Sequence, residues 1–549
     1  MSTVTLQHPD LGVFKGNAGD EVEQFLGIQY ATLRDRLSEP VVRTEYGPEI
    51  DATKHASTSY SAPNGFENEV GLFIQNEIPK PEEVNSDVDC LNLGITIPKR
   101  GPASASRLPV FVWIHGGGFV VGAASWPHYD HGRLVKLAAA NGVPVIGVGL
   151  NYRLGLSGFL TSEELKAAGY KGNNFLRDQR AGLEWVRRHI AGFGGDPDNI
   201  TIIGESAGAM AVTLHLFSQQ PIFQRAIATG GTCLVRPALP PVVHEGNYKQ
   251  VCTALGLDSL SSEERIKALL TLPMDQILAK VPPNIQPNAV IDGDIIAAFP
   301  SYATVMDPND ASVPAKSWLK ALAVGDSAFD ASVLYWLMSF LKPLSLKFPA
   351  SAKATLASHP AEAEKLLALY DFSDAADDET AFLKLLNFIN DVSFTLGTLA
   401  FAKGFSSGCD TNVFFFNEPN PWPGKFQGRA THVLDVVFLF QNYNEKLPPA
   451  QREAAQQMGV DFARFVAGQQ PWSKFEDRDG GRAAKVYGPS GTGSGIGQGE
   501  GAAKSTVVED AIASTGTGRK PEIVDIANAV GWDSLGAVFI DFILGKHLG

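Results

Sequence analysis

A serine flanked by glycines gives the clearest chemical signal in the sequence. The segment GESAG at residues 204–208 fits the pattern G-x-S-x-G, with a β-type apolar run before it and a helical pattern after it. The turn in such a unit is sharp, so its flanking residues must be small, as Gly204 and Gly208 are. It also places the hydroxyl near helix N-terminal N–H groups, which favour a developing anion. We predict that Ser206 is a nucleophile; the alternative is a turn serine without chemistry.

A glycine-rich loop upstream offers donors for an oxyanion. HGGGF at residues 115–119 follows LPVFVWI, an apolar run typical of a buried strand. The N–H groups of Gly117 and Gly118 can converge on one point, and the N–H of Ala207, just after the predicted nucleophile, adds a third donor. A flexible glycine turn is the alternative, and the GESAG segment downstream favours the oxyanion loop.

A serine hydroxyl needs a base, which is usually histidine. In sheets of this type the chain order is serine, acid, histidine, so the base should follow the nucleophile. The histidines beyond Ser206 are His215, His244, His359, His432 and His547. His432 lies in a loop after a late predicted strand at residues 412–419, where a base is expected. We predict His432 as the base, with a structural loop histidine as the alternative.

The carboxylate that orients the histidine has two candidates. Asp326 closes a short β-type segment at residues 319–326, and Asp330 follows soon after it. The chemistry requires only a carboxylate that reaches the imidazole. These residues alone leave the choice between the two open.

The residues of the site need a scaffold that brings distant parts of the chain together. Apolar β-type runs alternate with helical patterns, which predicts an α/β protein with a mostly parallel sheet and helices on both faces. A β-hairpin is predicted at residues 11–31, and a mostly helical insertion that covers the site at 250–400. Other strands are predicted at 89–99, 108–117, 143–153, 199–203 and 224–231, and a helix at 177–194.

The length of 549 residues would allow several domains. Because the predicted site residues are far apart in the chain yet must meet, we expect one catalytic domain over residues 1–549. The glycine-rich segment 488–504 is expected to be a flexible loop, since it lacks the strand and the Lys-Ser/Thr of a phosphate-binding loop. The last twenty residues, from Val530, are typical of a docked amphipathic helix.

Composition excludes several functions. The chain is 44% hydrophobic and 19% charged, as in folded proteins, and its net charge of −14 disfavours a nucleic-acid partner. No secretory signal starts the sequence, and no uncharged apolar run is long enough to predict a transmembrane helix. HYDH at residues 128–131 contains potential metal ligands, but no further ligand cluster lies nearby in the sequence, so a solvated loop is expected there.

Several motifs, taken in order, resemble those of the type-B carboxylesterases, the cholinesterase and fungal-lipase family of the α/β-hydrolases. The resemblance covers roughly residues 10–470 and implies the α/β-hydrolase fold. The motifs that carry it are FLGIQYA (25–31), DVDCLNL (87–93), HGGGF (115–119), NYRLGLSGFL (151–160), the long stretch at 172–209 and GRATHVLDVVFLF (428–440).

The resemblance also implies the roles of single residues: nucleophile for Ser206, base for His432, and oxyanion donors for Gly117, Gly118 and Ala207. Placing Gly325 on the family's glycine before the acid favours Asp330 over Asp326. The family usually has Glu at that position, and Asp is shorter by one methylene, so the loop must lie closer to the histidine.

Glu205 resembles a family acid close to the site, and we expect it to order a buried network. Secreted family members bridge the cysteine of the D-C-L motif to an upstream cysteine, but no cysteine precedes Cys90. With no leader, this favours a reducing, cytoplasmic location and a buried Cys90 thiol. The cysteines are Cys90, Cys233, Cys252 and Cys409, without a C-x-x-C pair, which argues against a zinc cage.

Together these features predict a lipase-like serine carboxylic-ester hydrolase that acts on a small-molecule ester through an acyl-enzyme. No metal or organic cofactor is expected, and the oligomeric state is left open. The alternatives are acyl transfer or cyclisation on a secondary metabolite in the same pocket, and a non-catalytic binding relative of the fold. Candidate pocket-lining residues are Phe299, Tyr335, Trp336 and Phe394.

Overall fold

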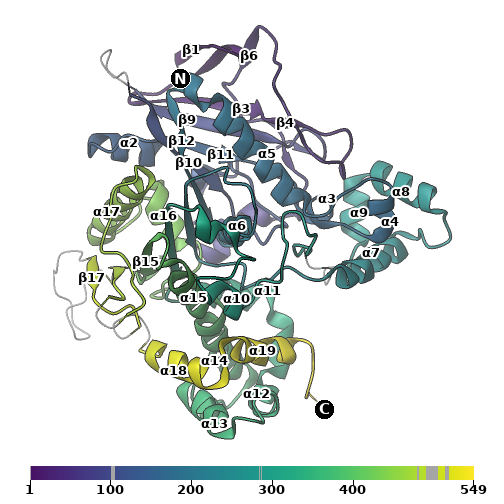
Figure 1. Ribbon diagram of the computed structural model, residues 1–549, viewed down its shortest axis with the longest axis vertical. Coiled ribbons are helices and arrows are strands. Elements are labelled where there is room, and N and C mark those ends of the chain that lie inside the picture. Colours follow the sequence, from purple (N-terminus) through teal and green to yellow (C-terminus); the bar gives the residue numbers. More distant parts are fainter. Residues whose placement is uncertain are drawn as a thin grey trace.

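A large mixed sheet forms the centre of the protein (Figure 1). The computed structural model describes residues 2–99, 106–282, 285, 287–478, 481–489, 505–512 and 518–548. Within these residues the sheet has 13 strands, in the order β1-β2-β3-β9-β11-β10-β12-β13-β14-β15-β16-β17, with β6 paired to β2. The bounds are β1 Ser2–His8, β2 Gly12–Ala18, β3 Val22–Gln29, β6 Glu49–Asp51, β9 Asn92–Pro98, β10 Leu108–Ile114, β11 Ile146–Leu150, β12 Gly195–Glu205, β13 Arg225–Thr229, β14 Ala321–Ser327, β15 Asp410–Phe416, β16 Ala484–Tyr487 and β17 Thr506–Val508. Short ribbons pair β4 (Ala31–Thr32) with β5 (Val41–Val42) and β7 (Thr58–Ser59) with β8 (Asn85–Ser86).

The strands from β11 to β16 in this order run parallel, and antiparallel strands flank them. Parallel strands are covered on both faces, which is why their sequences are continuous apolar runs. In β10, LPVFVWI, every residue except Pro109 is buried. The prediction of a mostly parallel central sheet is therefore confirmed.

Helices surround this sheet (Figure 1). Their bounds are α1 Gly65–Asn68, α2 Gly132–Ala140, α3 Gly155–Phe159, α4 Glu163–Ala167, α5 Asn174–His189, α6 Ala207–His215, α7 Pro241–Leu255, α8 Ser262–Thr271, α9 Met274–Lys280, α10 Tyr302–Met306, α11 Leu334–Leu337, α12 Phe348–Thr355, α13 Pro360–Leu369, α14 Asp378–Ile389, α15 Leu396–Phe405, α16 Leu434–Phe440, α17 Pro449–Val466, α18 Lys520–Val530 and α19 Trp532–Ile543.

The core lies in two layers, one on each face of the sheet. Successive side chains of a strand point to opposite faces. Val110, Val112 and Ile114 of β10 join the core that contains α5 and α6, whereas Phe111 and Trp113 join the core that contains α2, α16 and α17. The alternation explains how one apolar strand binds helices on both sides.

The N-terminal hairpin is confirmed, with one addition. β2 and β3 pair antiparallel through Asn17↔Gln24 and Ala18↔Glu23. A further strand, β1, pairs with β2 at the edge of the sheet. Its sequence STVTLQH is mostly exposed, so it has little of the apolar pattern that marks the inner strands.

The helices of residues 250–400 fall into two groups, separated in the chain by β14. Helices α7, α8 and α9 extend to the right in Figure 1 and contribute to a small separate core with residues of α4. Helices α12, α13 and α14 lie at the bottom of the same view, beside α18 and α19.

The C-terminal residues form a bent helix pair, α18 and α19, with an angle of 98° between them. In α19, Trp532, Leu535, Val538 and Phe542 are buried, which confirms the predicted docked amphipathic helix. By length and apolar composition, Asp378–Phe405 passes as a candidate membrane span within the described residues, and 94% of its apolar window is buried inside the protein. The bent C-terminal pair passes the same test when taken together.

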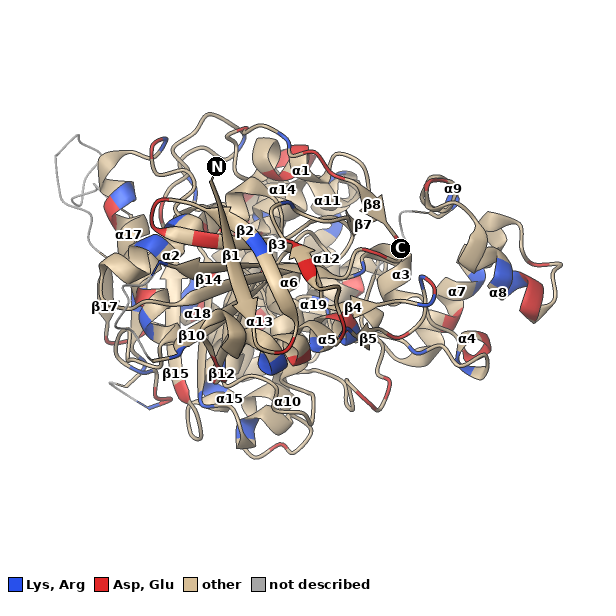
Figure 2. Cartoon of the chain, turned by 90° about the horizontal axis from the view of Figure 1, so that it is seen from above, with Lys and Arg blue, Asp and Glu red and all other residues tan. Residues whose placement is uncertain are grey.

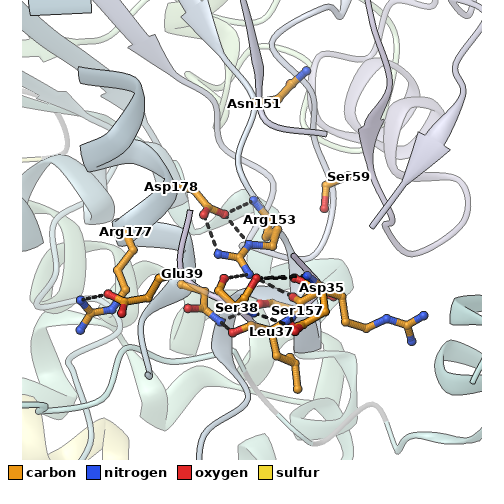
Figure 3. Close-up of polar contacts among 12 residues, drawn as sticks. Asp35, Leu37, Ser38, Glu39, Ser59, Asn151, Arg153, Ser157, Arg177 and Asp178 are labelled. Carbon is orange, nitrogen blue, oxygen red and sulfur yellow. Dashed lines mark hydrogen bonds and ion pairs between the residues drawn. The ribbon is translucent and has the colours of Figure 1, made fainter. Parts of the chain in front are cut away.

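A buried ion pair ties the N-terminal loop to the first layer of helices (Figure 3). The guanidinium of Arg153 donates to both carboxylate oxygens of Asp178 on α5, at 2.8 and 2.7 Å, and both side chains are fully buried. The same guanidinium donates to the carbonyl oxygens of Arg36 and Ser38. Arg153 of the NYR motif thus fastens the loop at residues 36–38 to α5.

Charged residues of both signs are interspersed over the surface helices and loops (Figure 2). All four cysteines are free thiols, and Cys90 is fully buried as expected. The predicted glycine-rich loop at 488–504 lies outside the described residues, apart from its first two positions.

Candidate active site

Ser206 lies on a strained turn between β12 and α6. Its backbone angles are φ 58° and ψ −125°, outside the regions that non-glycine residues usually occupy. Such strain persists only where the surrounding structure enforces it, and it is found most often at functional sites. Ser206 is partly exposed at the turn, whereas the last six residues of β12 and all of α6 are buried.

The two glycines of the motif permit this turn by close backbone contact. A Cβ on Gly204 would overlap with the backbone of Gly208, and a Cβ on Gly208 would overlap with the carbonyl oxygen of Ile114 at the end of β10. Helix α6 therefore begins directly against two neighbouring strands. This is the physical reason for small residues on both sides of the serine.

The structure brings Ser206, His432 and Asp330 together from distant parts of the chain. His432 Nε2 lies 2.8 Å from Ser206 Oγ, and His432 Nδ1 lies 2.7 Å from Asp330 Oδ1. The tautomer that satisfies both contacts carries the proton on Nδ1 and donates it to Asp330, so that Nε2 accepts from the hydroxyl. Asp330 is 0% exposed and His432 is 2% exposed.

Two loops position the acid and the base. Phe329 and Thr431 form an isolated parallel bridge, and the Phe329 N–H donates to the Ala430 carbonyl at 2.9 Å. The second oxygen of Asp330 accepts from the backbone N–H of Ser327 at 2.7 Å. This pairing brings the acid loop next to the histidine loop, which compensates for the shorter reach of an aspartate.

The other candidates for acid and base lie elsewhere. Asp326 accepts a hydrogen bond from Thr395 at 2.7 Å, and it is Asp330 that contacts His432. His215 contacts Gln179, His244 contacts the Ala289 carbonyl, His359 contacts Ser358, and His547 is exposed near the C-terminus.

The glycine loop at 115–119 is held in a left-handed conformation near the serine. Gly117 and Gly118 have φ values of 99° and 61°, and a Cβ on Gly117 would overlap with the Val121 carbonyl. Within the described residues, the N–H groups of Gly117 and Gly118 donate to no backbone carbonyl. The N–H of Ala207 is the first of α6, where the helix has no partner for it.

The side chains of Arg236 and His115 hold the glycine loop in place. Arg236 donates to the Gly118 carbonyl at 3.0 Å. The ring of His115 contacts the Gly116 carbonyl at 2.9 Å and stacks on Tyr152, with centroids 4.5 Å apart. Burial lowers the pKa of His115 to about 4, so the ring stays neutral at physiological pH. The local sequence gives no signal for Arg236, which comes from a different part of the chain.

Glu205 places a second carboxyl at the histidine. Its Oε1 lies 3.2 Å from His432 Nε2, and the side chain is 1% exposed. Burial, followed by the negative charges of Asp435, Glu69 and Asp330, raises the pKa of Glu205 well above its usual value. The surroundings therefore favour the neutral carboxylic acid.

Two residues next to the site carry weaker sequence signals or none. Gly230 has a φ of 62°, and a Cβ there would lie 3.2 Å from both Asp330 Oδ1 and Glu205 Oε1. Asp435, three residues after the histidine, accepts a hydrogen bond from Thr229. The double glycine after β13 was a possible signal for Gly230, whereas Asp435 is an ordinary acidic residue in an apolar helix.

Of the four candidate lining residues, Phe394 lies next to His432. Phe394 packs edge-on against the His432 ring, with centroids 6.0 Å apart. Phe299 and Trp336 are 48% and 37% exposed, and Tyr335 packs against Phe382 and Phe426.

The expectation of a solvated loop at 128–131 is wrong. His128 and His131 are both buried, because the segment packs under the sheet between aromatic rings. His128 contacts the Glu69 carboxylate at 2.7 Å. In the part of the chain that the structure describes, no group of three or more His, Cys, Asp or Glu side chains has the arrangement of a metal site.

Comparison with known proteins extends the resemblance over most of the chain. The family model for the carboxylesterase family matches residues 3–479. Lipase 3 of Yarrowia lipolytica is 30% identical over 473 residues, 82% of this chain and 86% of the lipase. Cholinesterase of Mus musculus is 30% identical over 509 residues, 86% of this chain and 77% of that protein. A protein of Byssochlamys spectabilis named inactive carboxylesterase-like protein VdtD is 27% identical and covers 86% of this chain and 85% of its own.

Solved structures agree on the fold. A PNB esterase superposes with a TM-score of 0.67 at 24% identity, over 88% of this chain and 96% of its own. A thermophilic PNB esterase gives a TM-score of 0.68 at 23% identity. The sheet order, the strained serine turn and the match over residues 3–479 lead to one assignment: the chain belongs to the carboxylesterase family, with the α/β-hydrolase fold.

Proposed function

We propose that this protein is a serine carboxylic-ester hydrolase that works through an acyl-enzyme. The observation that carries the proposal is the continuous hydrogen-bonded chain from Ser206 through His432 to Asp330. A nucleophile, a base and a buried carboxylate in this geometry are the parts that acyl transfer requires. The family membership supports the same reaction class.

The first half of the reaction forms the acyl-enzyme. His432 Nε2 takes the hydroxyl proton as Ser206 Oγ bonds to the ester carbonyl carbon. The tetrahedral intermediate collapses when the carbon–oxygen bond to the alcohol breaks, and the imidazolium gives its proton to the leaving oxygen. Asp330 remains ionised and keeps the imidazole in the tautomer that Nε2 needs.

The second half releases the acid. His432 takes a proton from a water molecule, which attacks the acyl carbon, and then returns the proton to Ser206 Oγ as the ester bond to the enzyme breaks. The products are a carboxylic acid, an alcohol and the original enzyme. The reaction therefore consumes one water for each ester and needs no oxidant or reductant.

Backbone donors meet the negative charge of both tetrahedral intermediates. We assign this role to the N–H groups of Gly117, Gly118 and Ala207. Losing one such donor typically costs about 10²–10³-fold in turnover. The contact of Arg236 with the Gly118 carbonyl supports the assignment, because it fixes the peptide units that would carry the donors.

Glu205 supports the base without replacing it. Its neutral form adds no negative charge beside Ser206 in the ground state. When His432 becomes an imidazolium, the carboxyl at 3.2 Å offers a favourable electrostatic contact. Phe394 packs edge-on against the His432 ring, which favours a stable orientation of the ring.

A substrate screen with a matched variant tests the proposal. The wild-type protein should hydrolyse p-nitrophenyl esters, and a series from short to long acyl chains gives the acyl preference. Ser206→Ala should lose this turnover and keep its circular-dichroism spectrum and melting temperature. A serine-directed phosphonate should label wild-type Ser206 once per chain, as read by peptide mass spectrometry, and should not label the variant.

The remaining alternatives correspond to other outcomes of this screen. Labelling of Ser206 with slow hydrolysis, together with fast ester formation when an alcohol is added, would indicate acyl transfer. A protein that neither turns over esters nor takes up the phosphonate would be a non-catalytic relative. Turnover retained in Ser206→Ala would contradict the assignment of the nucleophile.

A further inference from the structure

Two basic residues of the C-terminal segment lie beside residues that flank the loop of Asp330. Arg519 directly precedes α18, and Lys520 is the first residue of that helix. Both lie beyond residue 479, where the match to the family model ends. Lys520 is only 5% exposed. Burying an ammonium group costs free energy unless nearby groups compensate its charge. The neighbours of Lys520 therefore show which residues it interacts with.

Lys520 faces a carboxylate at the end of β14. It shares a small cavity with Asp326, Asp391 and Thr395, and its ammonium lies 3.0 Å from the centre of the Phe415 ring. Asp326 is 2% exposed and also accepts from the Thr395 hydroxyl at 2.7 Å. The positive charge of Lys520 lowers the cost of a buried carboxylate at Asp326, and the charges of Asp326 and Asp391 do the same for Lys520.

Arg519 holds the neighbouring helical turn. Its Nε donates to Asp391 Oδ2 at 2.7 Å and its Nη2 to Oδ1 at 3.3 Å. The Tyr370 hydroxyl donates to Asp391 as well, at 2.9 Å. Asp391 belongs to η8 (Asn390–Thr395), a π-helical turn that connects α14 to α15.

The turn η8 is also hydrogen-bonded to the loop that carries Asp330, the proposed catalytic acid. The Asn390 side chain accepts from the Ala331 N–H at 3.1 Å and donates to the Ala328 carbonyl at 3.3 Å. Phe394, on the same turn, packs against His432. Residues 326–331 are thus fixed at one end through Asp326 and at the other through Asn390, with Asp330 between them.

We propose that Lys520 is a positioning residue that holds the Asp330–His432 pair in register, by fixing the end of β14 through Asp326 and the turn η8 through Asp391. The proposal rests on the esterase function proposed above. Lys520 contacts none of the reacting atoms; its effect passes through the loop. A displacement of about 1 Å at a catalytic pair is enough to reduce turnover strongly.

A double-mutant cycle tests this role. Lys520→Met removes the charge at similar length, Asp326→Asn removes the opposite charge, and the double variant removes both. Turnover is expressed per active site, counted by complete phosphonate labelling, so that unfolded protein does not lower the value. Lys546→Met is the control, because Lys546 forms an exposed ion pair with Asp541 on the same helix pair.

Lys520→Met should lower kcat per site about tenfold with KM within about twofold, since it disturbs chemistry rather than substrate binding. Asp326→Asn alone should lower kcat about threefold. In the double variant, kcat should also fall about threefold, because neither buried charge is left without its partner. Independent effects would instead multiply to about thirtyfold. Lys546→Met should match the wild type.

A spectroscopic measurement separates this proposal from the proposed function. The downfield proton resonance of His432 Nδ1–H, bound to Asp330, should shift or broaden in Lys520→Met and return in the double variant. This measurement needs no substrate, so it remains decisive even if the wild type hydrolyses no ester. An unchanged resonance together with an unchanged kcat per site in Lys520→Met would overturn the proposal. Losses that multiply in the double variant would overturn it as well. If Lys520→Met fails to fold, the double variant still allows the test, because it has no unpaired charge.

Discussion

The carboxylate of Asp330 is held from two sides before any substrate binds. One oxygen accepts from the Ser327 N–H and the other contacts His432 Nδ1. The peptide N–H fixes the plane of the carboxylate, so that its second oxygen points at the imidazole. Asp326 lies four residues earlier on the strand and is bonded to Thr395 instead. The two aspartates therefore have different tasks.

Substitution of these two aspartates by asparagine should separate the tasks. Asp330→Asn should lower kcat by on the order of 10³–10⁴-fold, because an amide no longer favours the required tautomer of His432 or balances the imidazolium charge. Asp326→Asn should lower kcat only about threefold. Steady-state kinetics with a p-nitrophenyl ester, normalised by phosphonate titration, measures both. The reverse order of effects would show that Asp326 is the acid.

The sequence contains the local part of this site. Ser206 and its glycines are recognisable because a sharp turn imposes residue types on consecutive positions. His432 could be selected because chain order limits the candidates. Arg236 and Lys520 could not be found in this way, since the bond of Arg236 to Gly118 and the place of Lys520 beside Asp326 depend on folding of distant segments.

At the scale of elements, the unit that matters most is the strand β12, the turn and the helix α6. The helix must begin close to β10, because Gly208 lies against the Ile114 carbonyl. This closeness forces the turn and thereby the positive φ of Ser206. The strain is thus maintained by packing of backbone on backbone, which cannot easily relax.

Gly208→Ala should therefore be costly, although alanine is the better helix former. We expect a loss of about 3 kcal/mol in the free energy of unfolding, or a failure to accumulate folded protein, because the added Cβ overlaps with backbone. Urea unfolding and the rate of phosphonate labelling measure the effect. Gly246→Ala in α7 is the matched control: nothing lies within 4 Å of its added Cβ, so stability should stay equal or rise by up to about 1 kcal/mol. Equal behaviour of the two variants would argue against the packing explanation.

Elements with strong apolar patterns were predictable, and edge elements were not. β10 and β14 are buried on both faces, and their runs of apolar residues reflect that directly. β1 and β17 lie at the two ends of the sheet with exposed side chains, so tertiary pairing rather than sequence pattern determines them. The buried segment at 128–131 was misinterpreted for a related reason: its polar residues are paired inside the protein, His128 with Glu69 for example.

On the scale of the whole molecule, the interior around the site is acidic. Glu205, Asp330 and Asp435 are each at most 1% exposed, and Glu69 lies nearby. The candidate site thus gathers acidic groups in a chain whose net charge is already −14. Burial makes carboxyl groups harder to ionise. At a pH where they must ionise in the folded protein, the free energy of unfolding is therefore lower.

Asp435 offers a measurable case of this cost. Burial, followed by the charge of Asp330, raises its pKa from 3.8 to about 6. Because the folded pKa lies above the unfolded one, the folded state binds more protons between these values, and stability falls as pH rises from about 4 to about 6. Above about pH 6 the penalty stays constant at about 3 kcal/mol, because the folded and unfolded pKa values differ by about 2.2 and each pKa unit corresponds to about 1.4 kcal/mol.

Asp435→Asn should remove this penalty, because asparagine has the same shape, still accepts from Thr229 and cannot ionise. The free energy of unfolding of the variant relative to the wild type should rise by on the order of 2 kcal/mol between pH 4.5 and pH 7.5. Urea unfolding at both pH values gives this difference. Val437→Ala, an apolar change at a fully buried position of the same helix, should cost the same amount at both pH values, since it alters no titrating group. A difference between Asp435→Asn and the wild type that does not change with pH would contradict this explanation. It would mean that the Asp435 carboxyl ionises as easily in the folded protein as in the unfolded chain, and that contacts other than the one with Thr229 compensate its charge.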